Sequence, residues 1–440
     1  MPGRRECEVM ERYESYKPSG IQWASRIPAH WRVERAKWLF QRMERPVRPE
    51  DDVVTAFRDG QVTLRTNRRT EGFTNSIQEH GYQGIRKGDL VIHAMDAFSG
   101  AIGVSDSDGK ATPVYAACVP RGEYPINNYY YAYVLRYMAH SGYIASLSKG
   151  IRERSTDFRF AEFRELLLPL PPIEEQYCIV AFLDKKIAEI DAAISKKERL
   201  IALFYEQKKC LIRESILTGM ISAVPSRDSG IAWIGSIPSH YHLSRLGFLA
   251  RIGNGSTPNR SVLGYWDRGT IPWLNSSKVN DFEIFDADQF ITKRAARECH
   301  LPLVAAGSLL VAITGEGKTR GMVALTKIDT TINQHLAYIT VTEKNLDPEF
   351  LLYYLTSIYH ILRDESSSQG STKGAITCGE LRKVPVVFPP IDEQHSSVSH
   401  IRRLADHVDK SLSITLRQIA SLHEFRSVLI ARTVTGKLRV

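Results

Sequence analysis

The chain has 440 residues, a length that favours two to four domains over one. It carries 58 Lys and Arg against 49 Asp and Glu, a net charge of +9, and 43% of its residues are hydrophobic. This composition excludes a broadly disordered chain. The longest uncharged stretch, 299–315, is interrupted by Pro302 and Gly307, which argues against a membrane span.

The start of the sequence and the cysteines bear on location. No apolar core like that of a secretory signal follows Met1. The six cysteines are scattered without a CxxC pair, which argues against a zinc ribbon or a disulfide framework. We therefore expect a cytoplasmic protein with no membrane partner. The basic excess allows an anionic partner without identifying one.

Two landmarks occur twice, in the same order. Residues 19–31 match residues 229–241, with Ser, Gly, Ile, Trp, Ile, Pro and His coinciding at an offset of 210. The motif Pro-Pro-Ile-Glu-Glu-Gln at 171–176 matches Pro-Pro-Ile-Asp-Glu-Gln at 389–394, at an offset of 218. Two ordered, gap-free matches indicate a tandem duplication.

Taken in chain order, this plan predicts an α+β fold. Two mixed, strand-rich globular units are separated and followed by long helices, with expected boundaries at 1–170, 171–220, 221–388 and 389–440. Short apolar runs bounded by glycine predict strands in both units, at 89–93, 100–104, 308–313 and 320–325. Aromatic-rich segments predict a helix near the end of each unit, at 126–143 and 348–362.

Each Pro-Pro-Ile motif is followed by apolar residues that step 3-4-3-4, the seam of a left-handed coiled coil. Proline suits a first helical turn and glycine a left-handed helix end, so Pro171, Pro389, Gly219 and Gly436 mark the limits of two helices. Each helix could pack on its own unit. A seam this long favours pairing with its duplicate, as an antiparallel coiled coil. The seam residues are Ile187, Ile190, Ile194, Ile201, Phe204 and Leu211, then Val408, Leu412, Ile419, Leu422 and Leu429.

The segment Ala312–Thr319 fits a relaxed P-loop pattern. A P-loop must open a helix, whose N-terminal amides hold the phosphates. The residues that follow Thr319 instead predict a strand, so we expect a turn that presents Lys318, Thr319 and Arg320 to an outside anion. An ATPase that uses Ala312–Thr319 is the alternative from another functional class.

Other catalytic patterns are missing from the sequence. It has no HExxH pair and no Asn-Pro-Pro-aromatic motif for methyl transfer. We expect no catalytic residue, no metal site and no cofactor of its own.

Several basic or amide-rich segments suit nucleic-acid binding, because forked guanidinium groups and Asn or Gln amides match base edges and phosphates. In the first unit these residues are Arg65, Asn67, Arg68, Arg69, Lys149, Arg152, Arg154 and Arg159. In the second unit they are Asn254, Ser256, Thr257, Asn275, Lys278, Lys318, Thr319, Arg320 and Lys373.

The order of these features resembles the DNA-specificity subunit of type I restriction-modification systems. The segments Trp23–His30 and Trp233–His240 are similar to the opening of that family's target-recognition domains. Residues 253–258, 307–317 and 332–334 resemble its weaker internal signatures. In the first unit, Val114–Cys118 stands where the family has an Ile-Asn-Gln-type segment.

The resemblance implies a non-catalytic subunit that binds double-stranded DNA and reads a bipartite, asymmetric site. It also implies that the helices set the separation of the half-sites and dock two adenine-N6 methyltransferase subunits, with restriction/translocase subunits joining for cleavage. S-adenosylmethionine, ATP and magnesium would bind those partners. A coiled-coil DNA-binding adaptor without sequence preference is a third possibility.

Overall fold

The structure is a computed structural model that describes residues 12–68, 80–147, 157–217, 224–315, 317–367 and 374–440. By its contacts the chain divides into two units, Met1–Glu198 with Leu416–Val440, and Arg199–Thr415. The division falls within two long helices, α5 (Ile173–Leu217) and α12 (Ile391–Val434). Each unit therefore holds one globular part and a segment of both long helices, while the four-part boundaries stay a prediction.

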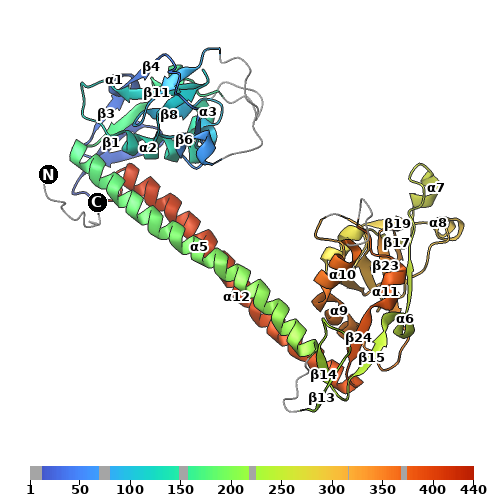
Figure 1. Ribbon diagram of the computed structural model, residues 1–440. Helices are drawn as coiled ribbons and strands as arrows, with labels where there is room; N and C mark the ends of the chain where they lie inside the picture. Colours follow the sequence, from blue (N-terminus) through green and yellow to red (C-terminus); the bar gives the residue numbers. More distant parts are fainter. Residues whose placement is uncertain (1–11, 69–79, 148–156, 218–223, 316, 368–373) are drawn as a thin grey trace. The chain divides into compact units, whose positions relative to one another are not determined.

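The globular part of the first unit is strand-rich (Figure 1). Its strands are β1 (Tyr16–Ile21), β2 (Ala24–Pro28), β3 (Arg32–Arg35), β4 (Phe40–Met43), β5 (Val54–Ala56), β6 (Val62–Leu64), β7 (Gln83–Ile85), β8 (Leu90–His93), β9 (Ile102–Val104), β10 (Gly109–Ala111), β11 (Tyr115–Pro120) and β12 (Leu167–Leu170). Its helices are α1 (Ala36–Leu39), η1 (Arg65–Asn67), η2 (Ala97–Ser99), α2 (Asn128–His140), α3 (Tyr143–Leu147) and α4 (Phe160–Phe163).

The core of this unit is an antiparallel sheet in the order β4–β11–β8–β9. Helix α2 packs on β8 and β9. It does so because its aromatic and aliphatic residues fall on one face, where Tyr130, Tyr131, Val134, Leu135 and Met138 are all fully buried. The chain leaves this helix at Gly142, whose φ of 80° suits glycine.

The globular part of the second unit is likewise built of many short strands and a few helices. Its strands are β13 (Ser226–Asp228), β14 (Ser236–Pro238), β15 (His242–Arg245), β16 (Ala250–Asn254), β17 (Ile271–Leu274), β18 (Glu283–Ile284), β19 (Gln289–Ile291), β20 (Leu309–Ala312), β21 (Val323–Thr326), β22 (Thr331–Ile332), β23 (Leu336–Val341) and β24 (Pro385–Phe388). Its other helices are α6 (Leu246–Leu249), α7 (Leu263–Trp266), η3 (Ser276–Asn280), α8 (Lys293–Glu298), α9 (Pro348–Ser357), α10 (Tyr359–Ser367) and α11 (Cys378–Lys383).

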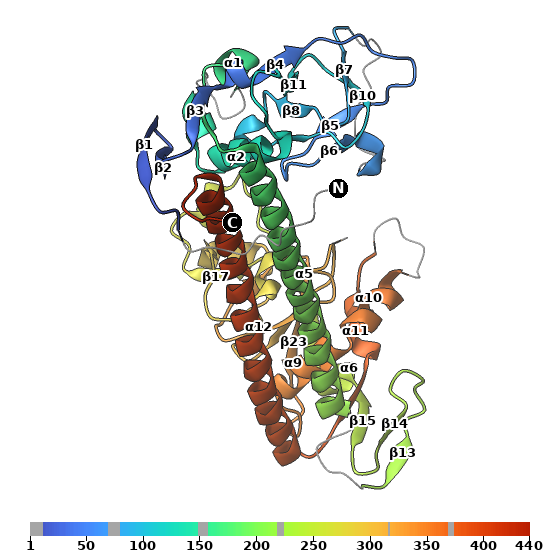
Figure 2. The ribbon, with the colours of Figure 1, turned by 90° about the vertical axis from the view of Figure 1, so that its left-hand side faces the viewer.

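Each globular part has its own core, and the two cores have the same architecture. The sheet of the second unit runs β16–β23–β20–β21, the same order as β4–β11–β8–β9, and adds β18 at its end. Helix α9 packs against β21 and α11 against β16, and Figure 2 shows both helices in the globular part of the second unit. The pairs β3–β12 and β15–β24 correspond as well. The separate sheet β19–β17–β22 has a smaller counterpart in the first unit, where the antiparallel pair β5–β6 adjoins β10 through the parallel bridge between Val53 and Lys110.

The four predicted strands and the two predicted helical segments are confirmed in kind. The strands appear as β8, β9, β20 and β21, with ends that lie within three residues of the expected ones. The helical segments form α2 with α3 and α9 with α10. No helix in the described part of the chain is long and apolar enough to cross a membrane.

The repeated Pro-Pro-Ile motif attaches each long helix to its globular part through glutamine. The Gln176 side chain is fully buried; its Oε1 accepts from the Asn127 amide at 2.8 Å and its Nε2 donates to Pro171 O at 2.9 Å. In the second unit, Gln394 is equally buried and accepts from the Asp347 amide at 2.8 Å. Asn127 and Asp347 are the N-caps of α2 and α9, so each glutamine joins the long helix to the helix that covers the sheet.

The preceding glutamate brings the two sequence landmarks together. Glu175 accepts hydrogen bonds from His30 Nε2 at 2.6 Å and Trp31 Nε1 at 2.9 Å. Glu393 accepts from His240 Nε2 at 2.8 Å and from the hydroxyl of the next residue, Tyr241, at 2.9 Å. The recurrence of both landmarks in the sequence thus has one structural cause.

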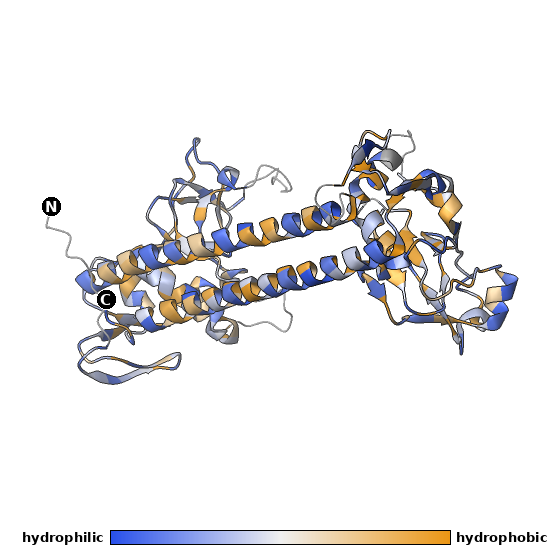
Figure 3. Ribbon diagram, turned by 90° about the horizontal axis from the view of Figure 1, so that it is seen from below, coloured by the Kyte–Doolittle hydropathy of each residue, from blue (hydrophilic) through white to orange (hydrophobic). Residues whose placement is uncertain are grey.

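The long helices pair in both units, and hydrophobic residues recur at short intervals along them (Figure 3). In the first unit, Ile190, Ile194 and Leu429 are buried in one cluster, and Ile187, Ile419 and Leu422 pack against it. The Asp191–Arg426 ion pair and the Lys197–Gln418 hydrogen bond lie along the same segment. Because the number on α12 falls as that on α5 rises, the helices are antiparallel there.

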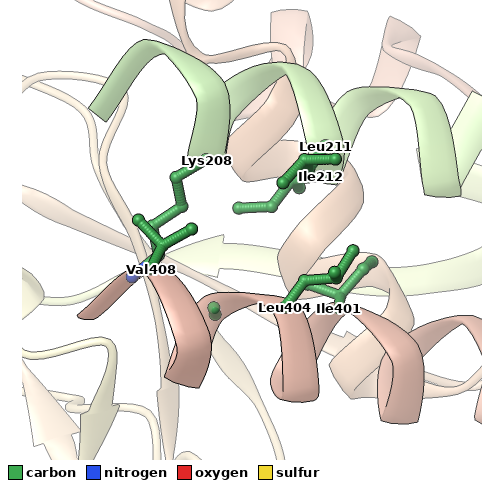
Figure 4. Close-up of a pocket in the computed structure, with 7 residues that line it drawn as sticks. Lys208, Leu211, Ile212, Ile401, Leu404 and Val408 are labelled. Carbon is green, nitrogen blue, oxygen red and sulfur yellow. The ribbon is translucent and has the colours of Figure 1, made fainter. Parts of the chain in front are cut away.

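The second unit continues this seam. Lys208, Leu211 and Ile212 of α5 face a row of α12 residues across the small gap shown in Figure 4. That row consists of Ile401, Leu404, Ala405 and Val408. Val408 and Leu412 are buried, whereas Ile201, Phe204 and Leu211 are half-buried. The predicted antiparallel pairing is confirmed inside each unit.

Candidate nucleic-acid interface

The loop Gly253–Pro258 of the second unit is fixed against the turn between β22 and β23. A Cβ on Gly255 would lie 1.8 Å from Ile332 O, so no larger residue fits there. The Ser256 amide donates to the same carbonyl at 3.0 Å. Thr257 donates through its hydroxyl to Gln334 Oε1. Residues from two distant parts of the sequence therefore form one surface.

This surface continues into a chain of exposed polar side chains. Gln334 Nε2 lies 3.3 Å from His335 Nε2, and His335 Nδ1 lies 2.7 Å from Thr314 Oγ1. We call Thr257, Thr314, Gln334 and His335 the polar patch. Amide, imidazole and hydroxyl groups can both donate and accept, so the patch can bond to base edges or phosphates.

Two predicted DNA-contact residues beside the patch have partners within the unit. The Asn275 side chain caps η3 by accepting from the Ser277 amide at 2.9 Å. Lys278 Nζ lies 2.8 Å from Asp286 and 3.1 Å from Asp288. These hydrogen bonds raise the pKa of Lys278. A DNA contact by Lys278 would have to compete with both carboxylates, and its assignment stays a prediction.

The turn between β20 and β21 exposes Lys318 but not Arg320. Lys318 is exposed, whereas only 6% of the Arg320 surface is accessible. The Arg320 guanidinium lies against Gly374, where an added Cβ would come within 1.8 Å of its terminal nitrogen. The expectation that this turn presents Arg320 to an outside anion is therefore corrected, because close packing encloses the side chain.

The same turn bears on the P-loop alternative. Strand β20 ends at Ala312 and β21 begins at Val323, with turns between them. The predicted strand–turn–strand is confirmed. No helix follows Thr319 in this described stretch. A P-loop holds phosphates with the amides at the N-terminus of such a helix, and this stretch does not provide one.

In the first unit, the predicted basic segment begins in η1. Asn67 Nδ2 donates to Thr63 Oγ1 at 2.8 Å. Arg68 pairs with Asp59 at 2.7 Å and stacks on Phe57, with its guanidinium carbon 4.3 Å from the ring centroid.

Three of the predicted cations in this unit have contacts that the structure records. Arg65 Nε lies 3.5 Å from Thr55 Oγ1. Arg68 remains exposed despite its ion pair, and Arg159 pairs with Asp157. Four further predicted residues of this unit, Arg69, Lys149, Arg152 and Arg154, lie outside the described residues, as does Lys373 of the second unit.

Comparison with known proteins relates most of the second unit to a known family. Residues 238–418 match the family model of the type I restriction modification DNA specificity domain. This segment holds the polar patch, the sheets β16–β23–β20–β21–β18 and β19–β17–β22, and the α12 side of the seam in the second unit. This segment is similar to the type I restriction-modification specificity subunits. Members of this family are recognition subunits and not enzymes.

Similarity extends beyond the matched segment. The putative type I restriction enzyme MjaX specificity subunit of Methanocaldococcus jannaschii is 23% identical over 317 residues, 72% of this chain and 69% of that protein. A solved chain from work on complex assembly and conformational transition of the type I R-M system superposes with a TM-score of 0.63. It is 18% identical and covers 93% of this chain and 98% of its own. The HsdS subunit from Thermoanaerobacter tengcongensis gives a TM-score of 0.54, with the same identity and coverage. Both structures support the fold.

Sequence reasoning did not assign Gln334, His335 or Thr314 to the candidate interface. The segment Ile332–Gln334 was available as a family signature, and its amide could have been proposed as a base-reading group. His335 and Thr314 carry no local signal, because they meet only when the β20–β21 and β22–β23 turns come together.

Proposed function

We propose that the chain reads a bipartite, asymmetric DNA sequence, with each globular part reading one half. The observation that carries this proposal is the shared core with different exposed loops. Both units repeat the four-stranded sheet, the covering helix and the glutamine anchor. The first unit offers the basic segment at η1, whereas the second offers the polar patch. One scaffold with two unlike reading surfaces suits two unlike half-sites.

In this proposal the paired helices fix the separation between the half-sites. A buried apolar seam and ion pairs hold the helices in one register in each unit. Because a helix rises about 1.5 Å per residue, a fixed number of residues defines a fixed length.

The helices would also dock two adenine-N6 methyltransferase subunits, and restriction/translocase subunits would join them in the cytoplasm. Several large apolar side chains on the helices face solvent in this chain, as docking surfaces do. They are Leu200, Leu203 and Ile414 in the second unit and Leu416, Phe425 and Val428 in the first. S-adenosylmethionine, ATP and magnesium would bind the partner subunits.

Mapping of N6-methyladenine tests the proposal. The chain is co-expressed with the methyltransferase subunit, and the methylated sequence is read from cellular DNA. We expect one motif with two specific halves and a fixed, unspecific spacer. An undivided motif would contradict the bipartite proposal, and a flat sequence profile would favour the unspecific adaptor.

The ATPase alternative has its own test. Equilibrium dialysis of the isolated chain with ATP measures binding directly. ATP binding that is lost in Lys318→Ala would support the alternative, whereas we expect no binding by either protein.

A further inference from the structure

A cavity of about 720 Å³ opens in the second unit between α5 and the globular part. Lys209 and Arg213 of α5 form one wall, and these residues are four apart and so share a helix face. Lys318 of the β20–β21 turn and His360 of α10 lie on the other side. Apolar side chains complete the lining, including Val279, Phe282, Met322 and Val323. We call this cavity the α5 cleft.

Every charged residue in the lining is cationic. Lys209, Arg213 and Lys318 are exposed, and no Asp or Glu lines the cleft. The neighbouring Lys208 shows the contrast, because its Nζ is held by Asp409 at 2.8 Å. Within the described part of the chain, the recorded contact of Arg213 is a 3.4 Å hydrogen bond to the carbonyl of Trp233. The globular part of the second unit has no such excess, since residues 221–393 hold 17 basic and 17 acidic side chains.

The turn that carries Lys318 is held in place beside the cleft. The Tyr359 hydroxyl donates to Lys318 O, and Arg363 donates to Gly317 O at 2.6 Å. Arg363 also bonds the Tyr359 hydroxyl at 2.9 Å. The main chain at Lys318 is therefore fixed next to His360, and binding at the cleft does not first have to order the turn.

The corresponding corner of the first unit also gathers cations. His140 and His360 are 220 residues apart, the same offset as between the helix N-caps Asn127 and Asp347. Burial lowers the pKa of His140, and the positive charges of Arg136 and Arg426 lower it further. Arg426 is the counterpart of Lys208 and pairs with Asp191, whereas Ser427 and Ala431 stand at the positions of Lys209 and Arg213, so the long-helix cations of the cleft belong to α5 alone.

We propose that the α5 cleft holds the sugar–phosphate backbone of the DNA that the second unit reads. Phosphates would pair with Lys209, Arg213 and Lys318, and deoxyribose faces would rest on the apolar lining. Lys318 lines the cleft and is also one of the predicted DNA-contact residues, which favours DNA over an acidic protein segment. The inference rests on the proposed function and adds that α5 contacts DNA as well as spacing the half-sites. Such contacts position a protein on the duplex and carry no base information.

The salt dependence of binding by the full-length chain tests the cleft. Each phosphate contact adds about 0.9 to the slope of log affinity against log salt. The double variant Lys209→Ala/Arg213→Ala should therefore bind with a slope lower by about 1.8. Between 50 and 200 mM salt, the ratio of wild-type to variant affinity should shrink about tenfold. The loss should be equal for a selected duplex and a random duplex, measured by fluorescence anisotropy.

Arg403→Ala/Lys410→Ala is the matched control. It removes two exposed cations from α12 of the same unit, outside the cleft lining. We expect this control to retain nearly the wild-type slope. Circular dichroism melting of both double variants checks that each remains folded.

Three outcomes would overturn the inference. The cleft variant could match the control in slope and affinity. It could lose discrimination between the two duplexes with an unchanged slope, which would indicate base reading. It could bind DNA normally but fail to co-elute with the co-expressed methyltransferase, which would assign the cleft to a partner protein. If the wild-type chain bound both duplexes equally, the proposed function would fail, while the slope difference would still decide the cleft.

Discussion

The Nζ atom of Lys208 on α5 lies 2.8 Å from both carboxylate oxygens of Asp409 on α12. Its counterpart in the first unit is the Arg426–Asp191 ion pair at 3.2 Å. Asp191 and Asp409 are 218 residues apart, and so are Lys208 and Arg426. The duplication has therefore kept both the basic and the acidic residue. In each ion pair, the residue from α5 bonds to the opposite charge on α12.

A charge swap tests whether this ion pair helps to set the register. Lys208→Asp should lower the free energy of unfolding because it faces Asp409, and adding Asp409→Lys should restore it. The side chains are 30% and 54% exposed, so solvent screening limits the coupling to about 0.2–1 kcal/mol. Urea unfolding of Lys208→Asp, Asp409→Lys and the double variant, compared with the wild type, gives this coupling free energy. Lys410→Asp is the control, and a coupling near zero would leave the register to the apolar seam.

The buried glutamine anchors should matter more than the ion pairs. Gln394→Ala leaves the Asp347 amide and the Pro389 and Asn345 carbonyls without their side-chain partner. Buried groups of this kind cost about 1–3 kcal/mol each when unsatisfied. We expect a loss of a few kcal/mol in urea unfolding.

Two companion variants sharpen the test of the anchor. Gln394→Glu should also destabilise, because a carboxylate cannot donate to the two carbonyls. Gln207→Ala, at an exposed position on α5, should change stability little. Equal stability of Gln394→Ala and Gln207→Ala would contradict the anchoring role.

Arginines near η1 are expected to read the first half-site. Replacing Arg68 and Arg69 together by alanine should cost about 1–3 kcal/mol of discrimination for each base-reading pair that is lost. Competition binding with duplexes that vary one base pair at a time measures this. Arg48→Ala/Arg58→Ala removes two other ion-paired arginines of the same unit and should lower affinity without changing sequence preference. Unchanged preference in the Arg68/Arg69 variant would remove these residues from the reading surface.

Lengthening the helices tests their role in spacing. Seven residues inserted after Ile194 add about 10 Å at 1.5 Å per residue. Because Asp191 faces Arg426 and Lys197 approaches Gln418, a matching heptad is needed in α12 near Leu422. The double insertion should lengthen the tolerated spacer by about three base pairs, at 3.4 Å per base pair.

The insertion variants have a clear internal control. An insertion in α5 alone should break the register and destabilise the chain. Methylation mapping reports the spacer and both half-sites at once. A spacer that stays the same in the double insertion, with both half-sites intact, would show that the helices do not set it.

The sequence by itself determined the duplication, the long helices and their seam. These features depend on local periodicity and on the residue types that start and end helices, such as Pro171 and Gly436, so they can be read without knowing distant contacts. It also indicated strand–turn–strand at Ala312–Thr319, since a strand pattern is local as well.

Only the tertiary structure decided which side chains meet. It showed a common four-stranded core in units whose sequences differ, because a buried sheet constrains hydrophobic pattern more than residue identity. It showed that the Arg320 side chain is buried and that Lys278 pairs with two aspartates, although both residues look like free cations in the sequence. It placed Lys209 and Lys318 together in the lining of the α5 cleft. These residues are more than one hundred positions apart, and no local pattern records a contact that exists only once the chain has folded.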